Sequence, residues 1–153
     1  MANRTIITIM KISMITNCPT WLKEADTENE DVRILYGSVH WFGGTWLGGT
    51  WETGTWYDGT WRNGTWRNGV WHNGTWKGGI WQNGTWNNGT WKNGIWFNGS
   101  WEDGIWNNGY WENGTWYNGT WERGTWYDGT WKGGKWIKGK WINAWPTELL
   151  LTL

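Results

Sequence analysis

The apolar positions follow a period of five residues over most of the chain. From Trp41 to Trp141 a tryptophan occupies every fifth position without exception, which makes 21 in a row. A glycine lies three residues after each of the first 20, from Gly44 to Gly139. A period of five matches no face of an α-helix, and a glycine inside a helix costs about 1 kcal/mol relative to alanine. The pattern therefore argues against helix and indicates a tandem repeat.

Each slot of the five-residue unit has its own preference. The slot before tryptophan holds 12 Thr, three Ile and one Val among 20 repeats, and β-branched residues favour extended backbone. The slot after tryptophan varies freely, which is typical of a side chain in water. Asn, Asp or Gly fills the next slot in 18 of 21 repeats, and the glycine that follows makes a strong turn signal. Each unit is therefore expected to be a short extended segment followed by a corner.

The alternation of side chains along extended backbone predicts which residues face inward. The residues before and after each tryptophan share one side, and the variable residue lies outside, so the tryptophan is expected inside. The predicted corners are Gly64, Gly84, Gly94 and Gly114. The predicted core comprises Trp46, Trp51, Trp56, Trp61, Trp66, Trp71, Trp76, Trp81, Trp86, Trp91, Trp96, Trp101, Trp106, Trp111, Trp116, Trp121, Trp126, Trp131 and Trp136.

A continuous coil accommodates these short segments better than separate hairpins do. Three-residue strands are too short to stand as independent hairpins in water. If the chain turns the same way at every corner, each strand lies over an equivalent strand of the coil below, and the backbone groups pair between coils. A disordered Gly-rich repeat is the alternative, and the unbroken tryptophan slot argues against it.

The unit resembles that of the pentapeptide-repeat family, which is roughly small–polar–Leu/Phe–x–x with the small and large apolar residues inward. Residues 44–48, Gly-Thr-Trp-Leu-Gly, fall on these slots, and the match continues over residues 41–144. The resemblance implies a right-handed quadrilateral β-helix with four pentapeptides per coil. Here glycine replaces the usual alanine, and tryptophan replaces leucine or phenylalanine. A triangular, flattened or widened coil is therefore the alternative.

The repeat divides the chain into three parts. Residues 1–40 form an N-terminal cap region, residues 41–144 the solenoid, and residues 145–153 a C-terminal tail or cap. End coils make up a large share of so short a rod, so caps are expected to matter.

The N-terminal region contains two expected strands. Residues 5–16 are β-branched and apolar and predict a strand, with a secretion signal as the alternative. Five acidic residues within 24–31 predict a solvated loop, and residues 32–39 predict another strand. Trp21 and Tyr36 lie in frame with the tryptophan period, which suggests a degenerate first coil.

Charge and composition narrow the possible chemistry. Lys plus Arg and Asp plus Glu number 13 each, so the formal net charge is zero and no global field attracts nucleic acid or an anionic membrane. One cysteine and two histidines exclude an internal disulfide framework and offer little for catalysis or metal binding. The apolar N-terminal run is too short and too polar to span a membrane. We therefore expect a non-enzyme without cofactor or metal and with no specific nucleic-acid partner.

Two surface features are candidates for contact with a partner. In a four-sided coil, residues 20 apart stack on one face, which predicts a contact stripe of Tyr57, Phe97, Tyr117 and Ile137, with Lys77 between them. In the last coil, four lysines predict either an aggregation-resistant end or a site for an anionic partner: Lys132, Lys135, Lys138 and Lys140.

Together these features favour a structural or interaction protein, a rigid solenoid that acts as spacer, cap or docking surface. The family resemblance implies a bacterial or bacteriophage origin, with a virion or surface component as one form of it. The polar residues that interrupt the N-terminal apolar run favour a cytoplasmic or virion-associated location over secretion. Protein partners or self-association through the solenoid ends are expected. One alternative is a carbohydrate-binding or adhesin module that uses exposed aromatics. Another is a topoisomerase-binding DNA mimic, as in some pentapeptide-repeat proteins. The nine basic and seven acidic residues of the repeat count against this role.

Overall fold

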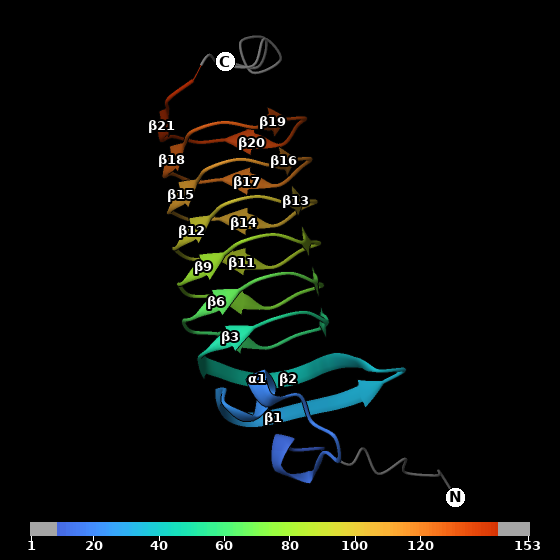
Figure 1. The fold of residues 1–153 in the computed structure, drawn as a ribbon. Coiled ribbons are helices and arrows are strands. Elements are labelled where there is room, and N and C mark those ends of the chain that lie inside the picture. The colour runs from blue at the N-terminus through green and yellow to red at the C-terminus, as the bar shows by residue number, and fades with distance from the viewer. Residues whose placement is uncertain (1–8, 144–153) are drawn as a thin grey trace, which may run out of the picture.

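The computed structural model of the protein describes residues 9–143 and shows a β-solenoid (Figure 1). Its coils stack along one axis, from the N-terminal cap to the last coil. Strands dominate, and one four-residue α-helix and one 3-10 turn are the only helices in the described residues. The predicted all-β solenoid with a tryptophan in every repeat is therefore confirmed.

The N-terminal cap combines these two helices with an antiparallel pair of strands. The 3-10 helix η1 (Ile12–Met14) and helix α1 (Thr20–Lys23) precede strand β1 (Asp26–Leu35). Strand β2 (Ser38–Gly48) pairs with β1 and then bends into the first coil of the solenoid. Since β2 crosses residue 40, the cap and the repeat share a strand.

The remaining strands are two residues long, and each ends on a tryptophan. They are β3 (Thr50–Trp51), β4 (Thr55–Trp56), β5 (Thr60–Trp61), β6 (Thr65–Trp66), β7 (Val70–Trp71), β8 (Thr75–Trp76), β9 (Ile80–Trp81), β10 (Thr85–Trp86), β11 (Thr90–Trp91), β12 (Ile95–Trp96), β13 (Ser100–Trp101), β14 (Ile105–Trp106), β15 (Tyr110–Trp111), β16 (Thr115–Trp116), β17 (Thr120–Trp121), β18 (Thr125–Trp126), β19 (Thr130–Trp131), β20 (Lys135–Trp136) and β21 (Lys140–Trp141).

The strands form three sides because each pairs in parallel with the strand 15 residues away. Trp41 lies beside Trp56, for example, and Trp46 beside Trp61. Side A consists of the first half of β2 with β4, β7, β10, β13, β16 and β19. Side B consists of the second half of β2 with β5, β8, β11, β14, β17 and β20. Side C consists of β3, β6, β9, β12, β15, β18 and β21, so its seven strands mark seven coils.

The expected quadrilateral coil with four pentapeptides is wrong, because three strands complete each turn. Two physical features favour the smaller number. Every corner glycine from Gly44 to Gly139 has positive φ, between +96° and +141°, a conformation that alanine in the resembled family would not readily adopt. Three indoles per coil meet edge to face in the middle, as Trp61 and Trp66 do at 6.0 Å and 74°, and close the interior.

Two backbone hydrogen bonds per repeat join successive coils. The backbone N–H of the residue before each tryptophan donates to the carbonyl oxygen of a corner glycine in the previous coil, as that of Thr75 does to Gly59 at 2.9 Å. The amide after each tryptophan donates to a tryptophan carbonyl, as Lys77 does to Trp61 at 2.7 Å. The short strands therefore owe their order to neighbouring coils rather than to local propensity.

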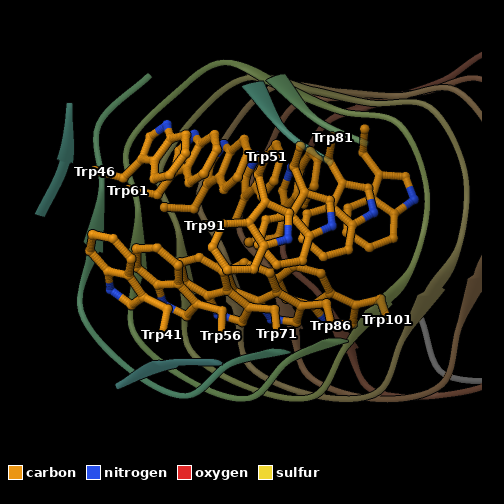
Figure 2. Packing of buried hydrophobic residues seen from close by; sticks show 14 of the residues in the cluster. Trp41, Trp46, Trp51, Trp56, Trp61, Trp71, Trp81, Trp86, Trp91 and Trp101 are labelled. Atoms are coloured by element: carbon orange, nitrogen blue, oxygen red, sulfur yellow. The ribbon is translucent and has the colours of Figure 1, made fainter. Parts of the chain in front are cut away.

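The core consists of three columns of stacked indoles, which Figure 2 shows in part. Within a column the ring centroids lie 4.7 to 5.1 Å apart, from Trp41–Trp56 to Trp116–Trp131, and the planes are nearly parallel. The predicted core tryptophans from Trp46 to Trp131 are buried, and Trp136 is half-buried. Inward tryptophan is therefore the observed arrangement, with offset stacking along the axis and edge-to-face contact around it.

Two indole N–H groups donate to corner carbonyls of the coil above. Trp91 donates to the carbonyl of Asn108 and Trp111 to that of Asp128, both at 3.1 Å. Most other buried indoles in the described residues have no acceptor within hydrogen-bonding distance. A buried donor without a partner costs about 1–3 kcal/mol. The stacking of the columns therefore has to offset the cost of desolvating many N–H groups.

The cap differs from the sequence-based expectation in three places. Residues 9–16 contain η1 rather than a strand, and the amides of Met10 and Ile12 bond to the carboxylates of Asp31 and Glu30. The acidic segment expected to be a loop forms most of β1, because it pairs with β2 across the hairpin. The strand expected over 32–39 is interrupted by a turn at Tyr36 and Gly37, which both have positive φ.

A degenerate first coil is also not present. Trp21 lies in α1, and Tyr36 is fully exposed at the tip of the hairpin. The C-terminal tail expected over 145–153 lies outside the described residues. Over residues 9–143, no helix has the length and apolar character needed to cross a membrane.

Candidate docking surfaces

The inward half of each repeat offers no room for a ligand. The corners predicted at Gly64, Gly84, Gly94 and Gly114 all have positive φ and lie against the carbonyl of the corner glycine in the coil below. A Cβ added at Gly94 would lie 2.5 Å from the carbonyl oxygen of Gly79 and 3.1 Å from the indole of Trp91. Candidate functional groups are therefore the outward side chains.

Side A carries a ladder of stacked rings. Phe42 stacks on Tyr57 at 4.8 Å between ring centroids, and Tyr57 stacks on His72 at 5.0 Å. The guanidinium of Arg33 lies 4.7 Å from the centre of the Phe42 ring, which closes one end of the ladder. At the other end the Asn87 amide lies 3.0 Å from Nδ1 of His72. The ladder therefore presents the edges of its rings to solvent and keeps their faces covered.

The structure does not bring the predicted contact stripe together. The stripe assumed a stacking interval of 20 residues, whereas the observed interval is 15. Tyr57 and Tyr117 lie on side A, Phe97 on side C, and Ile137 on side B, and all four side chains are exposed. These residues therefore form no continuous apolar surface.

Side B carries most of the positive charge of the solenoid, a feature that the sequence analysis missed. Arg62, Lys77 and Lys92 follow β5, β8 and β11 directly, so they occupy equivalent positions on three adjacent strands. All three side chains are exposed. Further along the side an open groove is lined by Lys92, Asn107, Glu122, Arg123 and Lys138. A search for like charges at intervals of 15 residues would have found this surface.

The four lysines of the last coil do not form one cluster. Lys132 lies on side A, Lys135 and Lys138 on side B, and Lys140 on side C. All four side chains are exposed. Only the pair on side B adds to a charged surface that extends over other coils.

The remaining chemistry-bearing side chains occupy separate places. Cys18 is buried in the cap, and its burial raises the pKa of the thiol above the ordinary value, while nearby Lys23 acts in the opposite direction. His40 lies 3.3 Å from the hydroxyl of Tyr57. Over residues 9–143, no three His, Cys, Asp or Glu side chains lie together in a group that could hold a metal ion.

Comparison with protein-family models, with curated proteins and with solved structures finds no match to this chain. The five-residue repeat and the β-solenoid are features in common with the pentapeptide-repeat architecture. The three-sided coil and the glycine corners differ from it.

Proposed function

We propose that the protein is a non-enzymatic scaffold, a rigid solenoid that presents docking surfaces along its sides. The observation that carries this proposal is the difference between the inward and the outward positions of the repeat. The inward tryptophan is constant and is buried in every coil but the last described, and the constant corner glycine lies against the backbone of the coil below. The outward slot varies freely, and its position is set by an unbroken lattice of hydrogen bonds. The side chains of the outward slot can therefore differ from repeat to repeat while the core stays the same.

The distribution of reactive groups supports a role without catalysis. Nucleophilic and acid–base catalysis needs side chains that lie within hydrogen-bonding reach of each other in a shielded pocket. His40 and His72 are on the outer surface, and Cys18 lies apart from both in the cap. The repeat resembles that of the pentapeptide-repeat family, some members of which bind topoisomerase, and this resemblance agrees with a scaffold.

The two alternatives from the sequence receive less support. A sugar stacks on the exposed face of an aromatic ring, but Phe42, Tyr57 and His72 on side A cover one another's faces. The exposed Phe97 and Tyr117 lie on different sides of the solenoid and form no shared platform. A DNA mimic needs a negatively charged rod, whereas side B is strongly positive over several coils. A docking surface that uses side chains other than aromatics fits the geometry better.

The test compares three variants, each with one side neutralised. In each variant the outward residues after tryptophan on a single side become Asn or Gln, and the tryptophans and glycines stay. We expect all three to keep the near-ultraviolet circular dichroism of the parent. Crosslinking in the native cell should then lose its specific products in one variant only. Equal products from all three variants and from unfolded Gly94→Val protein would overturn the proposal.

A further inference from the structure

The three-sided register sorts the charges of the solenoid by side. Side B carries six of the nine cations of residues 41–143 and one of the seven acids, Glu122. These cations are Arg62, Lys77, Lys92, Arg123, Lys135 and Lys138. Side A has one cation and three acids, and side C has two cations and three acids. A chain with zero formal net charge therefore has one strongly positive side.

Three cations on side B form a straight column over the second to fourth coils. Arg62, Lys77 and Lys92 lie on adjacent parallel strands, which are about 4.8 Å apart. Like charges directly opposite on neighbouring strands are unfavourable. The two ion pairs within residues 9–143, Arg33–Asp31 and Arg67–Glu52, involve none of these side chains. A polyanion that lies along the column would relieve this repulsion.

We propose that side B binds an extended, linear acidic polysaccharide, with carboxylate or sulfate groups along its length. This inference rests on the proposed docking function and names the class of partner for one side. The exposed cations supply charge complementarity, and the groove from Lys92 to Lys138 continues the column toward the last coil. Threonine and asparagine side chains on the same side, such as Thr75, Thr90 and Asn93, supply hydrogen-bond partners for sugar hydroxyls.

Other polyanions fit side B less well. Proteins that bind single-stranded nucleic acid combine positive charge with aromatic platforms for the bases, and no outward slot of side B holds an aromatic residue. Readout of the major groove of duplex DNA requires an inserted helix or ribbon, and side B consists of two-residue strands. Stable binding to an anionic membrane also needs apolar anchors, and the apolar outward residues Leu47, Ile105 and Ile137 belong to strands of side B that are not adjacent.

The first experiment removes charge from one side at a time. The test variant carries Arg62→Gln, Lys77→Gln and Lys92→Gln. The matched control carries Arg67→Gln, Lys132→Gln and Lys140→Gln, which removes the three cations of the solenoid outside side B. Gln82 already occupies the slot after a tryptophan, so glutamine fits this position.

Binding to heparin and to polygalacturonate, which represent sulfated and carboxylated chains, is measured by titration calorimetry at several salt concentrations. We expect the test variant to bind at least one of them about tenfold more weakly than the parent, and the control to stay within about twofold. Equal losses in both variants would overturn the assignment to side B.

The second experiment changes the alignment of the cations without removing any. One neutral copy of residues 87–91, Asn-Asn-Gly-Thr-Trp, is inserted after Trp96. This insertion moves every later repeat by one side, so that Arg123 and Lys138 leave side B while Lys92 stays on it. Three copies add a full coil and restore the alignment. We expect one copy to weaken polysaccharide binding about tenfold and three copies to leave it within about twofold. Equal affinities would contradict a continuous binding side.

The chemical class of the partner is tested by competition. Duplex DNA, single-stranded DNA and phosphatidylserine vesicles are added at equal total charge to the complex with the polysaccharide. Displacement by any of them at concentrations equal to those of free polysaccharide would overturn the polysaccharide assignment. Failure of both polysaccharides to bind the parent would overturn this inference, while the crosslinking result for the three neutralised sides would still decide the scaffold proposal.

Discussion

The tryptophans of the first coil are covered more completely than those of the last described coil. In the first coil, Trp41, Trp46 and Trp51 are completely buried. In the last, Trp131 is 3% exposed, and Trp136 and Trp141 are half-buried. The repeat unit is nearly the same in both coils, so the difference comes from what lies against them.

The cap completes the first coil in two ways. Strand β1 runs antiparallel to β2 and pairs with it up to the Asp26–Gly48 pair, which occupies backbone groups that would otherwise form an open edge. Below the indoles, Leu22 and Val32 are fully buried, and Trp21 contacts Trp51 edge to face at 5.2 Å. An end of this solenoid therefore needs both a strand to close the edge and apolar side chains to cover the rings.

Removal of the cap should have the largest effect of any change considered. A chain that starts at Ser38 would expose three indoles on one face, and half of about 200 Å² each, at about 25 cal/mol/Å², is roughly 7–8 kcal/mol. This loss approaches the whole stability of an ordinary domain. We expect aggregation or loss of cooperative unfolding, measured by light scattering and urea denaturation.

The control for cap removal is a chain that ends at Gly129 and lacks the last coil. This variant should fold and stay in solution, with a lower melting temperature. If the two truncations lower stability equally, the first coil owes nothing special to its cap.

Single tryptophan substitutions should rank the coils by how well they are covered. Trp91→Ala in the middle opens a cavity between indoles stacked on both sides and should cost about 3–5 kcal/mol. Trp46→Ala should cost as much, because the cap makes its coil complete. Trp136→Ala should cost about 1–2 kcal/mol, since its ring is half-buried. Urea unfolding of the three variants measures the ranking, and a cost at Trp46 as small as at Trp136 would contradict the role of the cap.

The stability cost of replacing a corner glycine should also differ between the middle of the solenoid and its C-terminal end. Gly94→Ala forces a Cβ against the Gly79 carbonyl at positive φ, and Gly94 itself accepts a hydrogen bond from Tyr110 in the coil above, so about 2–4 kcal/mol is expected. A Cβ at Gly139 would lie 2.7 Å from the Gly124 carbonyl oxygen, but Gly139 is exposed and the tryptophans beside it are half-buried, so Gly139→Ala should cost less.

Gly78 provides the control for the corner substitutions. A Cβ there would be 3.6 Å from the nearest atom, so Gly78→Ala should change stability by no more than about 0.5 kcal/mol. Thermal unfolding compares all three substitutions. A harmless Gly94→Ala would show that the corners tolerate side chains.

The smallest expected effect is on the rate at which Cys18 in the cap reacts. Cys18 is buried and its pKa is raised by burial, so its thiolate is scarce near neutral pH and its reaction with a disulfide reagent should be slow. The rate should rise as pH increases beyond the ordinary pKa of a cysteine. Leu22→Ala should accelerate labelling several-fold by loosening the cap, whereas Trp136→Ala at the far end should not. Equal acceleration by both substitutions would mean that the ends are not independent.

The repeat made the inward tryptophans and the corners predictable, because 21 consecutive units restrict the same slots in the same way. The number of sides was not predictable from slot preferences. It depends on the angle at glycines such as Gly94 and on how three indoles fill the interior, and both are properties of the assembled coil.

The cap and the candidate surfaces were not predictable from the sequence for a similar reason. The acids of residues 26–31 have the composition of a loop, and only their pairing with β2, distant in sequence, makes them a strand. The stripe through Tyr57 and Phe97 and the column through Arg62 and Lys77 are equally regular in the sequence. The coil period decides which of them exists, since it places only the second pair on one side.

The indole columns should also determine how the protein absorbs and emits ultraviolet light. Transition dipoles of rings less than 5.2 Å apart and nearly parallel, such as those of Trp76, Trp91 and Trp106, couple strongly. Ultraviolet light absorbed by one indole will therefore be shared with its neighbours before emission. Rings of neighbouring columns lie 6.0 Å apart with planes at 74°, as Trp76 and Trp81 do, so the energy also passes between differently oriented indoles. The native protein should therefore show an intense exciton signal in near-ultraviolet circular dichroism and strongly depolarised fluorescence. Both signals report the continuity of the columns without any added probe.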